Sequence, residues 1–217
     1  MENLVLILTL AGSAICAYLV AGLNPAIIIS RLVYHSDIRT QGSGNPGFTN
    51  FKRVYGGFWA WVVFVLDIGK GLALFFAFGL LFHYVETGEF GALSQFGCAY
   101  TGFFAMLGHA YPVWYRFKGG KCFLVVTTLV WFLDWRSGLV ALGVMLLVLT
   151  VFRFMSLSSI CSLLSAPISL FCFGTRDWRV LALCAVCVLF VVYRHRANIV
   201  RLCKGTESRF SFKKKKE

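Results

Sequence analysis

Long apolar runs separated by short polar segments dominate this chain. Charged or turn-forming residues bound each run. The runs cover residues 3–29, 54–82, 92–113, 122–133, 138–152, 157–173 and 178–193. A helix needs about 17–25 residues to cross the hydrocarbon of a bilayer, and the run 122–133 is short enough to need flanking residues or to be a partial span. The pattern therefore predicts an all-α integral membrane protein with about seven transmembrane helices.

The composition agrees with this pattern. Of the 217 residues, 59% are hydrophobic and 14% are charged, against roughly 25% charged residues in soluble domains. A soluble globule of this size has too little interior to hide so much apolar surface. The eight cysteines lie mostly within apolar runs, where a free thiol behaves as a small hydrophobe. Cys184 and Cys187 form an isolated C-x-x-C, so we expect no metal, redox or disulfide site, and no cofactor.

The loop charges predict the orientation of the helices. Eight basic residues between the runs and nine from Arg194 onward fall on one side of the predicted membrane, and three fall on the other. The positive-inside rule makes the richer side cytoplasmic. Seven crossings then place the N-terminus outside and the C-terminus in the cytoplasm. The net charge of +12 is confined to short loops and a tail, which fits a membrane surface, and we expect no nucleic-acid partner.

No segment is large enough to form a separate soluble domain. We expect a single transmembrane domain over residues 1–217, with a short basic cytoplasmic tail from about 200 to 217. The four lysines Lys213–Lys216 are expected to lie near anionic lipid headgroups, at about 1 kcal/mol per charge. The first three residues lack the basic region of a signal peptide, so we expect the first run to be retained as a helix.

One polar segment, residues 42–50 with the sequence GSGNPGFTN, is unlike the apolar runs on either side of it. Its glycines make backbone N–H groups accessible and its Ser, Thr and Asn side chains add donors, which is the chemistry of a phosphate-binding nest. Arg39 and Arg53 flank it with positive charge. The spacing also satisfies G-x-G-x-x-G, but no strand precedes it, so a dinucleotide site is excluded. The alternative is a plain turn between two helices.

Three further polar motifs fall on the same predicted side. They are His109 with Gly119, Gly120 and Lys121; Ser156 with Ser158 and Ser159; and His195 with Asn198. Each motif also has a purely structural alternative. His109 would be a histidine at a helix end, Lys121 a lysine that snorkels to the membrane surface, and the serines caps of a helix. His195 and Asn198 are three residues apart and therefore share a helix face. Asp67 and Lys70 have the same spacing within the second run, which predicts an ion pair near the cytoplasmic end.

Several of these motifs recur in one order and spacing in a known family. They are Ser43-Gly44-Asn45-Pro46-Gly47 with Thr49-Asn50; Leu66-Asp67 with Lys70-Gly71; Gly108-His109 with Tyr111-Pro112 and Phe117-Lys118-Gly119-Gly120-Lys121; Ser156-Leu157-Ser158-Ser159; and Tyr193-Arg194-His195-Arg196 with Asn198-Ile199 and Arg201-Leu202. Over residues 5–210 the chain resembles the bacterial acyl-phosphate:glycerol-3-phosphate acyltransferases, the PlsY family.

The resemblance implies a seven-helix enzyme of the bacterial inner membrane with its motifs facing the cytoplasm. It implies transfer of a fatty acyl group from acyl phosphate to the 1-hydroxyl of glycerol 3-phosphate, giving lysophosphatidic acid and phosphate at the start of phospholipid synthesis. It also implies that neither acyl-CoA nor acyl carrier protein is a direct donor. The implied partners are the two substrates, membrane lipids and an upstream enzyme that produces acyl phosphate.

The candidate site follows residue by residue. We expect the phosphate of the acyl phosphate to be held by Ser43, Gly44, Asn45, Thr49, Asn50, Gly119, Gly120 and Lys121. We expect glycerol 3-phosphate to be held and oriented by Arg53, Ser156, His195 and Asn198, with His109 as a further substrate-binding residue. The catalytic candidates are Ser43, Arg53, Lys121, Ser156, His195 and Asn198. The base is either His195 or the phosphate of the substrate.

One departure from the family concerns the residues after Lys121. The family usually continues with Gly-Val-Ala-Thr, whereas this chain has Cys-Phe-Leu-Val at 122–125. Thr127 lies two positions beyond the family threonine, so that role is not transferred to it. We expect a reshaped acyl-phosphate end of the site, or a lower activity.

Two other functions were weighed against this one. Acyl-CoA-dependent acyltransferases typically carry His-x4-Asp, and none of the four histidines of this chain has an Asp five positions later. A transporter or channel for a small anion is the alternative outside enzymes. Transporters place charge near the membrane midplane, whereas charge in this chain concentrates at one face.

Overall fold

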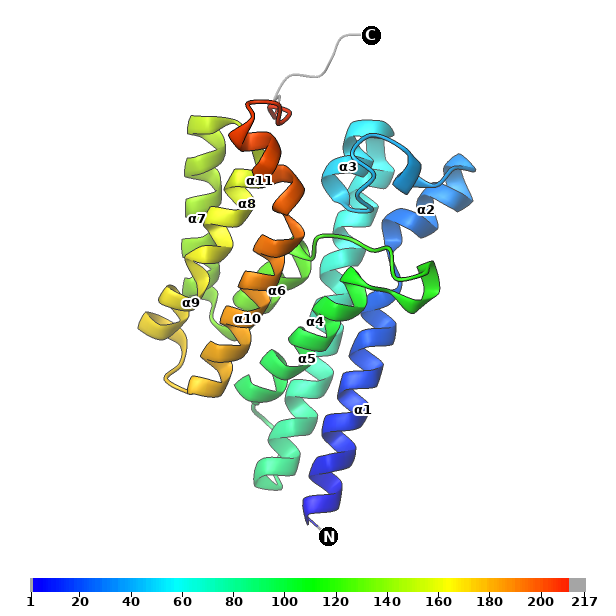
Figure 1. Cartoon of the computed structure of the whole chain (residues 1–217). Helices are drawn as coiled ribbons and strands as arrows, with labels where there is room; N and C mark the ends of the chain where they lie inside the picture. The colour runs from blue at the N-terminus through cyan, green and yellow to red at the C-terminus, as the bar shows by residue number, and fades with distance from the viewer. Residues whose placement is uncertain (1, 211–217) are drawn as a thin grey trace.

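A computed structural model of the chain describes residues 2–210, and every helix is drawn in Figure 1. The lysine run Lys213–Lys216 and its predicted contact with lipid headgroups lie outside the described residues. The main helices are α1 (Glu2–Gly22), α2 (Pro25–Tyr34), α3 (Phe48–Val54), α4 (Gly57–Thr87), α5 (Gln95–Ala110), α6 (Phe123–Leu133), α7 (Trp135–Phe152), α8 (Met155–Leu164), α9 (Ala166–Ser169), α10 (Trp178–Arg194) and α11 (Arg196–Cys203). Short helical turns are η1 (Ile38–Thr40), η2 (Val113–Tyr115) and η3 (Leu170–Gly174). Residues 2–210 contain no strand, so the all-α prediction is confirmed.

Several helical segments are long and apolar enough to cross a membrane. Within residues 2–210, four meet this test alone, and a fifth is α10 with α11, which are bent by 55° at their junction. The four are Asn3–Tyr34, Gly57–Thr87, Trp135–Phe152 and Met155–Gly174. α6 has 11 residues and α5 has 16, both below the usual crossing length. The seven crossings and their orientation therefore stay predictions.

The first predicted run, 3–29, is not one helix. α1 ends at Gly22, and Asn24 starts α2 as its N-cap, with its side-chain oxygen accepting from the N–H of Ile27 at 3.1 Å. Pro25 follows at the first helical position, where its missing N–H costs nothing. The amide of Asn24 also donates to the carbonyl of Pro46 at 3.0 Å. This residue therefore connects the break between α1 and α2 to the glycine-rich loop.

α5 lies at the centre of the bundle and packs against α1, α4, α6 and α10. Its buried positions are mostly small, including Gly97, Ala99, Gly102 and Ala105, so four neighbours can approach its axis closely. The main core cluster is built from these helices and continues into Leu163 and Leu170 of the sixth predicted span. This packing fixes the helix ends that carry the polar motifs.

The polar motifs gather at one end of the bundle. Figure 1 shows α2, α3, the start of α8 and α11 at the upper end, near the C-terminus, with the N-terminus at the opposite end. The segments that carry these motifs join successive helices, such as residues 35–47 between α2 and α3. Motifs up to 155 residues apart in the sequence, such as Ser43 and Asn198, thereby come to one place.

Candidate functional site

A cavity of about 1080 Å³ opens among α3, α4, α6, α7, α8 and α11. Loops and helix ends supply most of its polar lining, and α4, α6 and α7 supply most of its apolar lining, with Asp67, Thr127 and Thr128 among the apolar residues. The polar lining includes Ser43, Asn45, Thr49, Asn50, Arg53, His109, Lys121, Ser156, His195, Asn198, Arg201 and Glu207. The apolar lining includes Phe64, Ile68, Leu72, Phe123, Leu124, Trp131, Leu142 and Met145. An amphiphile with an anionic head and a hydrocarbon tail matches this division.

The apolar end extends along α6. From Phe123 to Trp131 the helix rises about 12 Å, at 1.5 Å per residue. The lining residues farthest from the polar end are Leu72 on α4, Trp131 on α6 and Leu142 on α7. Leu72 and Leu142 are 42% and 37% exposed, so the groove is open between α4 and α7 toward the surface that lipid would cover. The indole of Trp131 and the two leucines line this end together with Ser162, whose hydroxyl donates to the carbonyl of Ala141 at 2.7 Å.

Ten of the thirteen predicted site residues line this cavity. The three that do not, within residues 2–210, are Gly44, Gly119 and Gly120. The predicted roles of all thirteen stay proposals. What the geometry does establish is that four motifs far apart in sequence share one cavity wall.

The glycine-rich loop is held in shape by Asn50, which is 2% exposed. Its side-chain oxygen accepts from the N–H of Ser43 at 2.8 Å, and its side-chain nitrogen donates to the carbonyl of Gln41 at 3.0 Å. Gly42 has a φ of +57°, and a Cβ there would lie 2.3 Å from the side-chain oxygen of Asn50. Both ends of the Asn50 amide are thus occupied by the loop, so Asn50 shapes the nest. Within the described part of the chain, the hydroxyls of Ser43 and Thr49 have no protein hydrogen-bond partner and remain available.

The paired glycines before Lys121 serve close packing. The N–H of Gly119 donates to the carbonyl of Ala110 at 3.1 Å and that of Gly120 to the carbonyl of His109 at 3.0 Å. These two donors, which the sequence suggested for phosphate, are therefore already used by the end of α5. A Cβ would lie 2.1 Å from the carbonyl oxygen of His109 at Gly119, and 2.3 Å from Nε2 of His109 at Gly120. Only glycine lets this loop lie against α5.

Lys121 belongs to a hydrogen-bonded network around Glu207. Its Nζ donates to Oδ1 of Asn198 at 2.5 Å. Oε1 of Glu207 accepts from Nδ2 of Asn198 at 2.7 Å and from Oγ of Ser156 at 2.8 Å, and its Oε2 accepts from Nε of Arg201 at 2.7 Å. The sequence predicts that Lys121 binds one substrate and that Ser156 and Asn198 bind the other, whereas the structure joins all three residues in one network. The site therefore has one connected wall.

Lys121 and Glu207 of this network both have pKa values below the usual ones. Burial, followed by the nearby charge of Arg201, lowers the pKa of Lys121 to about 8. Burial alone would raise the pKa of Glu207, but the hydrogen bonds from Asn198, Ser156 and Arg201 outweigh it and lower that pKa. Glu207 is therefore ionised at neutral pH. Lys121 is mostly protonated at neutral pH and loses its proton as the pH rises through about 8.

The hydrogen bonds of His195 and Arg53 indicate what each can do in the cavity. Nδ1 of His195 lies 2.8 Å from the carbonyl oxygen of Val191. A carbonyl only accepts, so Nδ1 carries the proton in that bond and Nε2 of the neutral ring keeps a lone pair. Arg53 has no hydrogen bond or ion pair with any described residue and lines the cavity as an uncompensated cation. His195 is thus suited to accept a proton, and Arg53 to bind an anion.

The serines at the start of α8 do not cap that helix. Its N-cap residue is Phe154, with no side-chain cap. Ser158 donates back to the carbonyl of Phe154 and Ser159 to that of Met155, both at 2.8 Å. Ser156 alone turns to the network through Glu207. The helix-cap alternative is therefore wrong for these serines.

The predicted ion pair within α4 is confirmed. Nζ of Lys70 lies 2.8 Å from Oδ1 of Asp67, and it also donates to the carbonyl of Ala21 at 3.0 Å, at the end of α1. Nδ1 of His109 lies 3.1 Å from the same Nζ. His109 is 4% exposed and packs against Gly120. It therefore lines the cavity as a buried residue that supports the loop before Lys121.

The residues after Lys121 change the lining of the cavity. Cys122 is buried with a φ of +66°, a conformation that glycine would adopt without strain. Phe123 and Leu124 line the cavity where the family usually has small residues. Thr127 also lines it, and its hydroxyl is buried without a hydrogen-bond partner in residues 2–210. Larger side chains therefore line this part of the cavity, and a reshaped acyl-phosphate end or a lower activity stays a prediction.

Two residues of the network were not among the predicted site residues. Arg201 and Glu207 fall in the segment assigned to the basic tail, from about residue 200 onward, yet they fold back onto the site. The available signal was an acidic residue, Glu207, in the middle of that basic segment and close to the motif that holds His195 and Asn198. Arg39, expected to supply charge to the phosphate nest, is instead paired with Asp37 at 2.7 Å and does not line the cavity.

Comparisons with known proteins match this chain over nearly its whole length. The family described as "Glycerol-3-phosphate acyltransferase" matches residues 11–205. A glycerol-3-phosphate acyltransferase of Prochlorococcus marinus strain MIT 9312 is 34% identical over 196 residues, covering 90% of this chain and 94% of the relative. One from Coxiella burnetii strain Dugway 5J108-111 is 32% identical over 197 residues, covering 91% and 96%.

Two solved structures are also similar. One is the crystal structure of PlsY, an integral membrane glycerol 3-phosphate acyltransferase, in its glycerol 3-phosphate form, with a TM-score of 0.81 and 32% identity, covering 93% of this chain and 96% of that one. The other is the lysophosphatidic acid form, with a TM-score of 0.78 and 31% identity, covering 93% and 95%. Both solved chains adopt the helical arrangement found here.

Proposed function

This chain belongs to the glycerol-3-phosphate acyltransferase family and therefore transfers an acyl group to glycerol 3-phosphate in phospholipid synthesis; we propose that its acyl donor is an acyl phosphate. The observation that carries the proposal is the single cavity that joins a cationic, hydroxyl-lined end to an apolar groove open at the side. An acyl phosphate has that form, with a small anionic head directly on the reacting carbonyl and a hydrocarbon tail behind it. Family membership also disfavours the anion-transporter alternative.

The proposed reaction needs no covalent enzyme intermediate, because an acyl phosphate is an activated mixed anhydride. The oxygen of the 1-hydroxyl of glycerol 3-phosphate attacks the acyl carbon, and a new ester C–O bond forms. The bond between the acyl carbon and the phosphate oxygen breaks, and phosphate leaves with the electron pair. The hydroxyl proton goes to Nε2 of His195 or to a phosphate oxygen. The products are lysophosphatidic acid and phosphate.

The enzyme's task is then to bring two anions together and to offset the charge on the departing phosphate. Arg53, the uncompensated cation of the cavity, binds the phosphate of glycerol 3-phosphate. The hydroxyls of Ser43 and Thr49 and the amide of Asn45 hold the acyl phosphate. Lys121, held by Asn198, offsets the developing charge. Because these donors are partly desolvated and held in place, each contributes more than it would in water.

The membrane arrangement that we propose follows the loop charges. Seven helices cross the bacterial inner membrane, with the N-terminus outside and the cavity's polar end and C-terminus at the cytoplasmic face. The concentration of basic residues at the end of the bundle that carries the site supports this orientation. An upstream enzyme that makes acyl phosphate is the corresponding partner, since the donor would reach the cavity from the cytoplasm or the inner leaflet.

A donor assay tests the proposal. The purified protein in lipid nanodiscs receives glycerol 3-phosphate with either palmitoyl phosphate or palmitoyl-CoA, and lysophosphatidic acid is measured. We expect product with palmitoyl phosphate only, and phosphate release that needs both substrates. Product with palmitoyl-CoA and none with palmitoyl phosphate would refute the proposed donor.

A matched pair of lysine variants tests the site. Lys121→Ala should lower kcat by about a hundredfold or more, because a desolvated cation beside the leaving group is lost. Lys118→Ala is the control, since Lys118 lies three residues earlier on the same loop with an exposed side chain. Near wild-type turnover by Lys121→Ala would remove Lys121 from the mechanism while leaving the donor assignment intact.

A further inference from the structure

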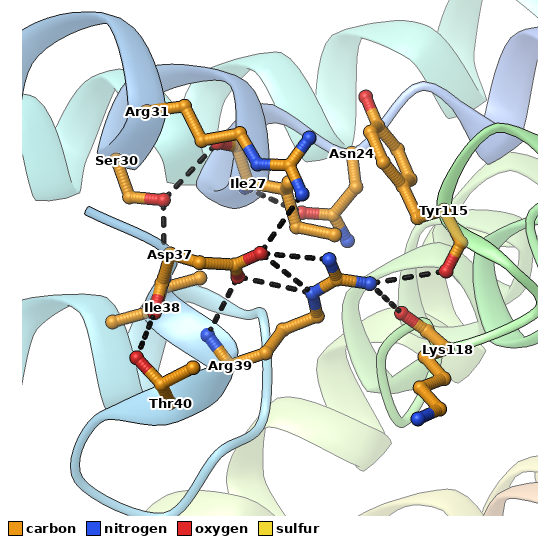
Figure 2. A network of polar contacts seen from close by, with 10 residues as sticks. All are labelled: Asn24, Ile27, Ser30, Arg31, Asp37, Ile38, Arg39, Thr40, Tyr115 and Lys118. Atoms are coloured by element: carbon orange, nitrogen blue, oxygen red, sulfur yellow. Dashed lines mark hydrogen bonds and ion pairs between the residues drawn. The ribbon is translucent and has the colours of Figure 1, made fainter. Parts of the chain in front are cut away.

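The Arg39 side chain spans the space between the two loops that carry the site. Figure 2 shows its guanidinium between Asp37, on its own loop, and the carbonyls of Tyr115 and Lys118 on the loop that precedes Lys121. Nη1 donates to the carbonyl of Tyr115 at 3.0 Å and to that of Lys118 at 3.4 Å. Its Nε and Nη2 donate to the Asp37 carboxylate at 3.0 and 2.7 Å. One planar group thus connects residues almost eighty positions apart.

Asp37 orients this guanidinium and offsets its charge. The carboxylate also accepts from the backbone N–H of Arg39 at 3.0 Å and from Nη2 of Arg31 at 2.9 Å. The hydrogen bonds from Arg39 hold the pKa of Asp37 well below its usual range, so the pair is charged throughout the physiological range. Arg39 is therefore a compensated cation that does not line the cavity, in contrast to the uncompensated Arg53.

The loop that Arg39 holds has a conformation that needs support. Arg116 and Phe117 both have positive φ, at +55° and +58°. Such non-glycine residues persist only where surrounding contacts determine the backbone. The two carbonyls that Arg39 binds, of Tyr115 and Lys118, stand immediately before and after this strained pair.

A second arginine holds the next residues of the same loop. Nε and Nη2 of Arg194, at the end of α10, donate to the carbonyl of Gly120 at 3.2 and 3.0 Å, and Nη2 donates to that of Gly119 at 3.1 Å. Lys121 follows directly. Guanidinium groups therefore hold the backbone before Lys121 at four carbonyls. Arg39 donates to two of them and Arg194 to the other two.

We propose that the Asp37–Arg39 pair is a positioning device that sets the loop 115–121, and with it Lys121, against the glycine-rich loop. Its role rests on the proposed function, in which Lys121 acts on the departing phosphate. Arg39 touches no reacting atom; it acts through the backbone that carries Lys121. The alternative, that Arg39 is itself a phosphate ligand, makes opposite predictions for changes at Asp37.

Steady-state kinetics of Arg39→Ala, Arg39→Lys, Asp37→Asn and the double variant Asp37→Asn/Arg39→Ala test the proposal. A displacement of about 1 Å at a catalytic group can cost about a hundredfold in rate. We expect each single change to lower kcat by about ten- to a hundredfold, with a smaller change in KM for glycerol 3-phosphate. Lysine keeps the charge but cannot bridge two carbonyls and a carboxylate together, so Arg39→Lys should not rescue. The double variant should lose no more than the worse single variant, because both residues form one device.

The outcomes separate the alternatives. Asp37→Asn at or above wild-type activity, with Arg39→Ala impaired, would show that Arg39 binds phosphate and would overturn the proposal. Full rescue by Arg39→Lys, multiplicative losses in the double variant, or losses that only follow a lowered melting temperature would also overturn it. Arg31→Gln is the control, since Arg31 contacts Asp37 but donates to no carbonyl of the second loop. An inactive Lys121→Ala beside fully active Arg39 variants would reject the positioning role alone.

Discussion

Glu207→Gln tests whether the network around Lys121 is organised by one carboxylate. The carboxylate accepts from Ser156 and Asn198 through one oxygen and from Arg201 through the other. Glutamine replaces one of these oxygens by an NH₂ group that cannot accept. Whichever way the amide is oriented, either Arg201 or the pair Ser156 and Asn198 is left facing a donor.

The magnitude follows from the burial of the partners. A hydrogen bond to a charged group contributes about 1.5–3 kcal/mol. The Glu207 side chain is 7% exposed and that of Arg201 is 41% exposed, so water can replace part of the Arg201 bond. We therefore expect a net loss of about 2 kcal/mol, which corresponds to about a thirtyfold fall in kcat/KM. The loss reaches the reaction through Asn198, which holds Nζ of Lys121.

The assay is kcat/KM for palmitoyl phosphate and glycerol 3-phosphate, with the melting temperature of each variant measured alongside. Glu89→Gln is the control, because Glu89 is exposed and its side chain has no partner in the described part of the chain. The pH dependence of the Glu207 contribution also has a predicted direction. Because the folded-state pKa of Glu207 is lowered, its contribution is present above the ordinary carboxyl value and is lost only as pH falls through the lower folded value. Wild-type activity in Glu207→Gln would refute the organising role.

Three further predictions follow from the cavity. Arg53→Ala should raise KM for glycerol 3-phosphate at least tenfold and leave the melting temperature unchanged, because Arg53 has no partner among residues 2–210; a lowered melting temperature would contradict this. The rate should fall as pH rises through about 8, where Lys121 loses its proton, and Lys121→Arg should move that limb upward if it stays active; an unmoved limb would assign it elsewhere. Trp131→Ala should favour acyl phosphates longer than palmitoyl in competition assays, because the indole is among the lining residues farthest from the polar end of the cavity; an unchanged preference would contradict this.

Much of the site could be predicted because polar residues are costly within apolar runs. Ser43, Arg53, Lys121, His195 and Asn198 stood out against such runs, and all five line one cavity. Their partners could not be predicted in the same way. The sequence assigned the glycine-rich loop with Gly119 and Gly120 to the phosphate, and the structure shows that the N–H groups of Ser43, Gly44, Gly119 and Gly120 already donate within the protein.

Arg39 and Glu207 illustrate this limit. As sequence, Arg39 is a basic residue beside a phosphate motif, and its charge is the property that composition makes visible. Whether that charge is free depends on Asp37, two residues away, and on carbonyls of Tyr115 and Lys118, which approach only after α5 has turned back. Glu207 similarly gains its role from Ser156, 51 residues earlier.

The sequence by itself determined the class of the protein: helices in a membrane, with the polar motifs at one end. The physical reason is local, since a chain in lipid must satisfy its backbone hydrogen bonds within each segment, and a helix does so. Only the tertiary structure decided which polar groups are free to meet substrate and which support the backbone. That depends on the neighbours each side chain acquires, and hydrogen-bond partners such as Lys121 and Asn198, 77 residues apart, meet only when the helices pack.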